Sequence, residues 1–154
     1  MSESPSNEEP PETSIDPADQ GTELDEIAKV VRENMDGEKL EILWRGTMNL
    51  ERWYFAGVGK FPQMRPFSGY IGEEPYVMAF TTRPRAEKYA GLQNLVEEGS
   101  KPSVMSFPPV EAAKLCIAQH SLGAKWVVFD DGWGSWRLPL AELGELVRRY
   151  RDPA

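Results

Sequence analysis

The chain contains one cysteine and one histidine, and their spacing would suit a nucleophile and its base. Cys116 and His120 lie four residues apart in VEAAKLCIAQHSL, a stretch that predicts a helix, so both would share one face. A thiol beside an imidazole is the arrangement of a cysteine nucleophile with a general base. The interior of a helix is nevertheless a poor place for an exposed nucleophile. We therefore expect Cys116 to be a buried apolar side chain and His120 to lie near the helix end, where the dipole favours it.

Other motifs that resemble functional sites lack the spacing that their chemistry needs. A zinc site of cysteine and histidine takes about three or four ligands, more than this chain supplies. Residues 130–132 (DDG) lack the spaced oxygen ligands of a calcium loop, and a turn explains them more simply. Residues 57–60 (GVGK) lack the spacing of a phosphate-binding P-loop. We expect no catalytic residue, no metal site, no bound cofactor and no enzymatic activity.

Acidic side chains are concentrated at the start of the chain. Residues 1–38 hold 12 of the 25 acidic residues but two of the 17 basic ones, so the remainder is close to neutral. Residues 1–22 contain six carboxylates and four prolines, with no basic or aromatic residue. Such a segment cannot bury enough apolar surface to offset the entropy of ordering it, so we expect a disordered acidic tail. Its role would be to solubilise the protein or, alternatively, to compete for a basic surface.

Charge and hydropathy also limit the classes of partner. The acidic tail would repel phosphate and the rest of the chain lacks a dense basic run, so we expect no nucleic-acid binding. No apolar run approaches the ~20 residues of a membrane span. The first residues, MSESPSNEEPPETS, lack the basic start and apolar stretch of a signal peptide. We expect a cytoplasmic protein without membrane contacts.

Hydrophobic spacing predicts strands and helices throughout residues 23–154. The first helix, 22–35, has Thr22 as its cap, and the helix over 81–99 has Thr82 as its cap. Central strands joined by helices need crossover connections, and therefore some parallel pairing. We expect one α/β domain with α+β character, in which helices pack on a single mixed β-sheet of about five or six strands. The expected strands are 40–48 and 52–58 (a hairpin about Asn49), 76–80, 103–107, 125–130 and 134–140. Two further helices are expected, one after Pro109 and one over 141–151. Residues 59–75 are expected to form a long loop.

Two stretches of this sequence resemble the SseB-like domain family, which is named for enhanced serine sensitivity. VMAFTTRPRAEKYA (77–90) is similar to its apolar strand, Phe-Thr-Ser/Thr step and following helix. Residues 106–143 are similar to its later part, which closes on a W-x-L-P-x-x-x-L motif. The resemblance covers roughly residues 40–148; the long 59–75 loop departs from it and the acidic tail lies outside it. It implies an α/β domain without an established enzymatic chemistry, and it carries over no catalytic residue.

Aromatic residues near arginines are the strongest candidates for a binding surface. Trp133 lies in a predicted turn between glycines, where burial is difficult, and the 59–75 loop is unusually apolar. Exposed Trp and Tyr side chains next to Arg are typical of interface hot spots. The alternative is that these rings cover the sheet and pack beneath the loop. The candidate partner-binding residues are Trp133, Trp136, Arg137, Phe61, Met64, Arg65, Phe67 and Tyr70.

These features favour two hypotheses about function. The first is a non-enzymatic interaction or regulatory module of the SseB-like kind, which binds a protein partner through the aromatic and arginine surface and the 59–75 loop. The second is an acidic chaperone or immunity-type protein that covers a basic or apolar client. Either would be a monomer or a weak dimer. An acidic tail beside an arginine-bearing surface also suggests self-inhibition by residues 1–22, which deletion of the tail tests.

Overall fold

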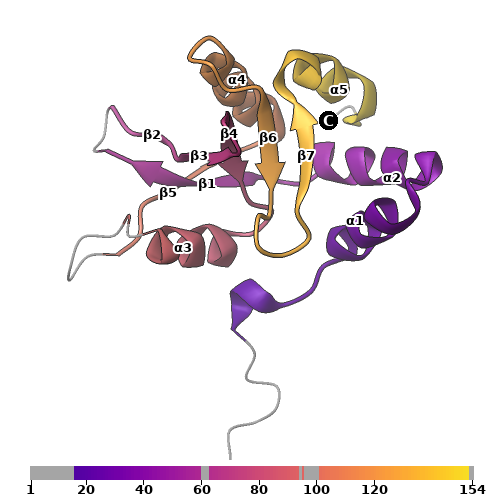
Figure 1. Ribbon diagram of the computed structural model, residues 1–154, viewed down its shortest axis with the longest axis horizontal. Helices are drawn as coiled ribbons and strands as arrows, with labels where there is room; N and C mark the ends of the chain where they lie inside the picture. Colours follow the sequence, from indigo (N-terminus) through magenta and orange to yellow (C-terminus); the bar gives the residue numbers. More distant parts are fainter. Residues whose placement is uncertain (1–15, 60–62, 94, 96–100, 153–154) are drawn as a thin grey trace, which may run out of the picture.

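The computed structural model describes residues 16–59, 63–93, 95 and 101–152, and within these ranges it has five α-helices and seven strands (Figure 1). The mixed α/β class predicted from the sequence is confirmed. The helices are α1 (Glu23–Asn34), α2 (Gly37–Met48), α3 (Arg83–Leu92), α4 (Pro109–His120) and α5 (Leu143–Tyr150), with short 3-10 helices η2 (Pro17–Asp19) and η3 (Leu140–Glu142). The strands are β1 (Trp53–Val58), β2 (Arg65–Pro66), β3 (Ser68–Ile71), β4 (Glu74–Ala79), β5 (Val104–Phe107), β6 (Trp126–Phe129) and β7 (Trp136–Pro139).

The strands form two sheets, so the prediction of a single sheet is wrong. One sheet is antiparallel and has the order β2-β1-β5, and the other has the order β3-β4-β6-β7. In the second sheet β4 and β6 run parallel, as the long crossover through α3, β5 and α4 requires. The other pairs of that sheet are antiparallel. The expected mixture of parallel and antiparallel pairing is therefore found within the four-stranded sheet.

The two sheets meet where β1 approaches the end of β4. Tyr54 and Phe80 exchange two backbone hydrogen bonds, of 2.9 and 2.7 Å. Phe67, which lies between β2 and β3, donates its N–H to Ala56 of β1 and accepts from Met78 of β4. The chain therefore crosses from one sheet to the other within residues 59–75, and the prediction of a long loop there is wrong, since the segment contains β2, β3 and the start of β4.

Residues 40–48, which we predicted as a strand in a hairpin with 52–58, belong to helix α2. Asp36 caps this helix by accepting from two backbone N–H groups of its first turn. The apolar residues recur at intervals of three and four, but their aliphatic and aromatic character resembles that of a buried strand. β1 accordingly pairs with β5, with Trp53 opposite Phe107, and not with the preceding segment.

Both predicted helix caps are confirmed. Thr22 Oγ1 accepts from the Asp25 backbone N–H at 3.2 Å, and the Asp25 carboxylate accepts from the Thr22 N–H at 3.0 Å. Thr82 Oγ1 accepts from the Arg85 N–H at 3.4 Å. α3 covers the first part of the helix predicted over 81–99, and most of the rest of that range lies outside the described residues.

Residues 16–22, which we predicted as part of a disordered tail, are ordered. Asp16 caps η2 by accepting from the Ala18 N–H at 2.9 Å, and Ala18 is completely buried. Residues 1–15, the rest of the predicted tail, lie outside the described residues. The contacts that hold this segment come from α3 and from the turn between β6 and β7, so local sequence patterns do not reveal them.

Opposite faces of the four-stranded sheet bury separate apolar clusters. Val127 and Phe129 of β6 face the cluster shared with α1, α2, α4 and α5, whereas Val128 faces the cluster beneath α3. In the larger cluster, Phe129 stacks on Trp136 with 5.7 Å between ring centroids. This packing places α1 and α2 beside β7, at one edge of the sheet (Figure 1).

Candidate functional site

The cysteine and the histidine of α4 do not form a catalytic pair. Cys116 is fully buried, as expected, and burial raises the pKa of its thiol, so the sulfur is protonated at neutral pH. His120, at the end of the same helix, is exposed. In the part of the chain that is described, no cluster of three His, Cys, Asp or Glu side chains is placed to hold a metal ion. No helix there has the length and hydropathy needed to cross a membrane.

The candidate partner-binding residues lie at three separate places. β3 is one edge of the four-stranded sheet and β7 is the other, so side chains from these two regions do not form one surface. Trp136 and Arg137 line a groove beside β7, whereas Trp133 contacts the segment before α1. The last group lies in or beside β2 and β3 and consists of Met64, Arg65, Phe67 and Tyr70. Phe61, which we also predicted, lies outside the described residues.

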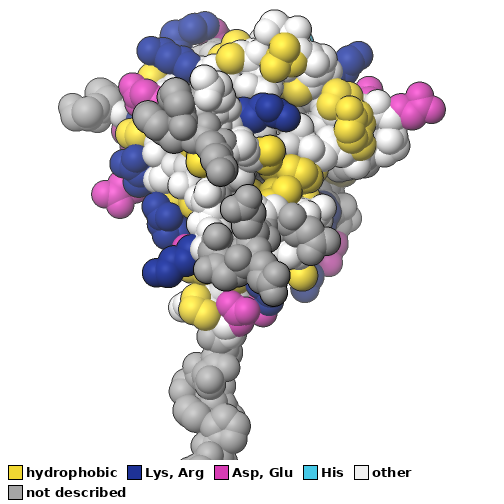
Figure 2. Space-filling model, turned by 90° about the vertical axis from the view of Figure 1, so that its left-hand side faces the viewer, with side chains coloured by type: hydrophobic (Ala, Val, Ile, Leu, Met, Phe, Trp, Pro, Cys, Tyr) yellow, Lys and Arg dark blue, Asp and Glu magenta, His cyan; other side chains and the backbone are white. Residues whose placement is uncertain are grey.

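The surface around β2 and β3 is exposed but shallow. Tyr70 is 73% exposed, whereas Phe67 is half-buried against Tyr89, with 5.8 Å between ring centroids. The hollow beside Arg65 has a volume of about 210 Å³, below the roughly 300–1,000 Å³ of ligand pockets. Figure 2 views the molecule from this end and shows hydrophobic side chains in separate patches among Lys and Arg. The surface therefore lacks the recess that would make it a strong candidate site.

A larger groove lies between α1, α2 and the β6–β7 hairpin. Its volume is about 530 Å³, which is within the range of ligand pockets. Two arginines and a serine are the polar residues of its described lining, which includes no carboxylate. This lining contrasts with the net charge of −8 of the whole chain. The lining residues are Ala28, Val31, Arg32, Met35, Leu40, Leu43, Trp44, Val128, Ser135, Trp136 and Arg137.

The two arginines of the groove are oriented by the fold and keep donors for a ligand. Arg137 donates to the Tyr76 hydroxyl at 2.7 Å, and its guanidinium lies 4.6 Å from the ring centre of Trp126. Arg32 donates to two backbone carbonyls of the β6–β7 turn. A guanidinium carries five N–H donors, so each arginine has further donors available. Both side chains are therefore suited to binding a carboxylate.

Met35 ends α1 and lines the groove in an unfavourable conformation. Its φ of 51° and ψ of 41° lie in the left-handed region, which at a helix end is usually occupied by Gly or Asn. Its side chain is 78% exposed. The flexible thioether of methionine adapts to varied apolar contacts. An exposed apolar residue in a strained conformation is costly for stability, and such positions cluster at binding sites.

Trp44 of α2 forms another part of the groove wall. Its ring packs edge-on against Tyr150, with 6.3 Å between ring centroids. The buried indole N–H has no hydrogen-bond acceptor among the described residues. Leaving a buried donor unsatisfied costs about 1–3 kcal/mol.

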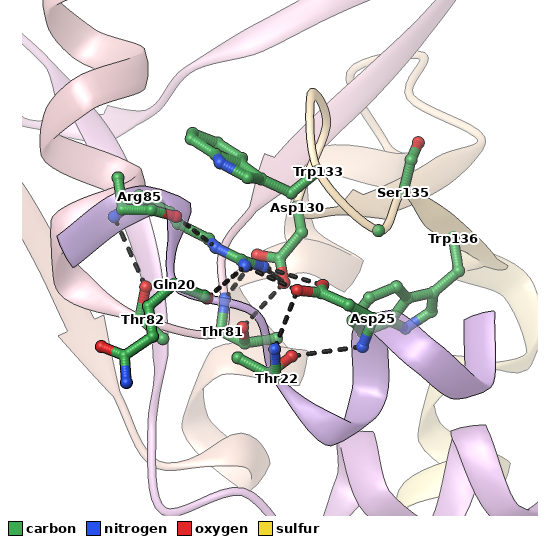
Figure 3. Close-up of polar contacts among 12 residues, drawn as sticks. Gln20, Thr22, Asp25, Thr81, Thr82, Arg85, Asp130, Trp133, Ser135 and Trp136 are labelled. Atoms are coloured by element: carbon green, nitrogen blue, oxygen red, sulfur yellow. Dashed lines mark hydrogen bonds and ion pairs between the residues drawn. The ribbon is translucent and has the colours of Figure 1, made fainter. Parts of the chain in front are cut away.

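A buried ion cluster positions α1, which forms one wall of the groove (Figure 3). Arg85 of α3 is 1% exposed and donates to Asp130 at 2.7 Å and to Asp25 at 2.9 and 2.7 Å. Asp130, at the end of β6, also accepts from the backbone N–H and the hydroxyl of Thr81. Burial is the largest single influence on the pKa of Asp25 and would raise it, but the hydrogen bonds from Arg85 and Thr22 and the charge of Arg85 together hold that pKa below its ordinary value. The cluster ties α1 to α3 and to β6.

The β6–β7 turn packs directly against α1. A Cβ atom at Gly134 would lie 2.6 Å from Oδ1 of Asp25, so a larger residue does not fit there. Near the other end of the helix, Arg32 bonds the same turn through the carbonyls of Gly134 and Ser135. These two contacts hold α1 against the β6–β7 turn.

Sequence reasoning found part of this site. Trp136 and Arg137 were predicted as binding residues, but the residues that α1 and α2 contribute to the groove were not. Arg85 was missed as well, although it lies on the buried side of α3 beside Ala86. A basic residue within an apolar helix face, together with aspartates directly after a buried strand, is a signal that indicates a buried ion pair.

No family model matches this chain, and no curated protein matches it. The resemblance to the SseB-like family therefore stays a prediction. Function has to be inferred from the geometry and charge of the site itself.

Proposed function

We propose that this chain is a binding module without catalytic chemistry of its own, and that its groove binds an acidic segment of a protein partner. The segment carries at least one bulky apolar side chain, which enters the groove between α1 and α2. The observation that supports this most directly is the lining, where two arginine residues contribute to an apolar recess without a described carboxylate. Opposite charge on partner and groove would guide association and set the orientation.

The size of the groove supports a peptide segment as its occupant. About 530 Å³ accommodates one or two large side chains together with the backbone that carries them. Arg32 and Arg137 would bind carboxylates of the segment, and Met35 and Trp44 would contact its apolar side chain. Amphipathic segments commonly bind in this way, with apolar anchors in a groove and charges at its border.

The charge of the groove also separates the two hypotheses drawn from the sequence. A chaperone or immunity-type protein that covers a basic client would use acidic side chains to do so. The groove instead favours an acidic partner, in agreement with an interaction module. The SseB-like resemblance implies a domain without established enzymatic chemistry, which is compatible with this proposal.

Selection from a library of random 12-residue peptides displayed on phage, against the immobilised full chain, tests the proposal. We expect the selected peptides to combine Asp or Glu with Leu, Phe or Trp. Their affinity should fall at least ~10-fold, equivalent to about 1.4 kcal/mol, on Met35→Glu and on Arg137→Glu. Selection of basic peptides would contradict the proposal and favour the chaperone or immunity-type hypothesis.

Two control variants match these substitutions closely. Leu122→Glu changes a residue that is 76% exposed, compared with 78% for Met35, but lies between α4 and β6. Arg83→Glu removes a guanidinium that lies over Tyr54, much as Arg137 lies over Trp126. We expect both controls to bind the selected peptides with unchanged affinity. Equal losses in the controls and the groove variants would show that net charge, and not the groove, determines binding.

A further inference from the structure

Residues 16–20, the strap, lie across α3 and the β6–β7 turn. Ala18 of the strap is fully buried, and its carbonyl accepts from Nε of Arg85 at 2.9 Å. The carbonyl of Gln20 accepts from Nη2 of the same arginine at 3.0 Å (Figure 3). The strap is thus bound through its backbone by a side chain from α3.

The acidic side chains of the strap are bound as well. Asp19 accepts from the indole N–H of Trp133 at 2.8 Å and pairs with Lys88 at 3.0 Å. Asp16 pairs with the same lysine at 3.1 Å. The three residues that hold the strap therefore present donors and positive charge, which is the chemistry that recognises an acidic peptide.

The site beneath the strap is built independently of it. Arg85 is held by Asp25 and Asp130, and its guanidinium lies 5.2 Å from the ring centre of Trp133. Trp133 packs edge-on against Phe80 of the apolar cluster beneath α3. These contacts fix the positions of the donors whether or not the strap is present, as a preformed binding site requires.

The strap itself is weakly attached. Ala18 is its one buried residue, and the ion pairs of Asp16 and Asp19 are exposed, so each contributes little in water. Gly21 connects the strap to α1 and has no atom within 4 Å of the position of a Cβ, so the connection is uncrowded. Detachment of the strap would leave α1 and its cap in place.

We propose that the strap is an intramolecular ligand of an acidic-peptide site formed by Arg85, Lys88 and Trp133. When the strap detaches, an acidic segment of a partner protein with two aspartates three residues apart binds in its place. The strap and the partner segment therefore exclude one another. This site is separate from the groove, and its occupancy does not depend on the groove binding anything.

The indole N–H signal of Trp133 in nitrogen-15 NMR spectra of the full chain tests the proposal, with Trp133→Phe to assign it. The probe is the blocked peptide SIDPADQG, residues 14–21. Asp16→Lys/Asp19→Lys should move the Trp133 signal, and added peptide should return it toward its wild-type position. A fluorescently labelled copy of the peptide, followed by fluorescence anisotropy, should bind wild type at least ~10-fold more weakly than the strap variant, because the attached strap competes at an effective concentration on the order of millimolar. If the amide signals of the double variant lose their dispersion, which would show that it is unfolded, the single variant Asp19→Asn replaces it. The same shift of the Trp133 signal and the same effect of added peptide are then expected.

Two further variants control the experiment. Glu51→Lys/Glu73→Lys makes the same change in net charge on exposed residues before β1 and between β3 and β4, and should behave as wild type. Lys88→Ala added to the strap variant should weaken binding of the peptide by about 2- to 10-fold, as expected for the loss of two exposed ion pairs. A Trp133 signal that the strap variant leaves unmoved, or a peptide that binds wild type and strap variant equally, would overturn the proposal. The acidic peptides selected for binding to the groove should bind the strap variant with the same affinity as wild type. The proposal for the strap and the proposal for the groove can therefore fail independently.

Discussion

Replacing Arg85 by methionine removes the cation of the buried ion cluster while keeping much of the side-chain volume. The guanidinium donates five hydrogen bonds, to Asp25, to Asp130 and to the carbonyls of Ala18 and Gln20. Without it, Asp130 is a fully buried carboxylate whose remaining partner is Thr81. Breaking a buried ion pair by removing one partner costs about 3–5 kcal/mol. The total free energy of unfolding of a domain is about 5–15 kcal/mol, so the variant should be markedly less stable than wild type.

Urea unfolding followed by tryptophan fluorescence measures this loss. We expect Arg85→Met to lower the free energy of unfolding by about 3–5 kcal/mol, and the melting temperature by roughly 10–15 °C. The control is Arg83→Met, two residues away on α3, where the arginine is exposed and lies over Tyr54; the expected loss is below about 1 kcal/mol. A loss below about 1 kcal/mol for Arg85→Met, or equal losses for both variants, would refute the assignment of Arg85 as the central tie.

The pH dependence of the difference in unfolding free energy between wild type and Arg85→Met gives a second check. Because the pKa of Asp25 is lowered in the folded protein, its stabilising contribution is present above the ordinary value of 3.8 and is lost as the pH falls through the lowered value. Burial raises the pKa of Asp130 even beside Arg85, and loss of the guanidinium would raise it further, so in Arg85→Met protonation of Asp130 relieves its buried charge as the pH falls. The stability difference between wild type and variant should therefore narrow as the pH falls below about 4. A difference that stays constant into acid would contradict an electrostatic origin.

Three other predictions follow from the described geometry. Met35→Gly replaces a residue in the left-handed conformation, so it should raise the free energy of unfolding by about 0.5–1 kcal/mol. It should also lower the affinity for the acidic peptides selected for binding to the groove. A less stable variant would show that Met35 is not strained. Cys116 should react with a thiol reagent only on unfolding, because its protonated sulfur is fully buried; labelling of the native chain at the rate of a free thiol would contradict this. The hydrogen bonds from Trp133 and Lys88 lower the pKa of Asp19, so the Trp133 indole signal should titrate with a midpoint below 3.8; a midpoint at or above 3.8 would show that the strap contact does not form in solution.

Local patterns in the sequence predicted local structure where one interaction dominates. Thr22 and Thr82 were expected as helix caps, and both accept the N–H that this role requires. The apolar runs of β4, β5 and β6 were expected as strands and are strands. Residues 40–48 were assigned wrongly because aliphatic and aromatic residues at helical spacing also suit a strand, and packing against α1 and α5 decides between the two.

Features that depend on contacts distant in the sequence were not predicted. The strap has almost no apolar residues, so composition indicates disorder, yet Arg85 and Trp133 supply the partners that order it. The groove likewise combines β7 with two helices that precede it by about a hundred residues, so Arg137 was found and Arg32 was not. The two-sheet arrangement depends on Phe67 bonding β1 and β4 at once, which has no signature in the loop that contains it.

Mapping a selected acidic peptide on the full chain by nitrogen-15 NMR tests the groove proposal most directly, because it distinguishes the three candidate surfaces in one titration. We expect the amide signals that move to belong to the end of α1, to the start of α2 and to β7, with the indole N–H of Trp44 among the side-chain signals that change. Changes centred instead on Arg65 and Tyr70, or on Lys88 and Trp133, would contradict the groove as the site of binding.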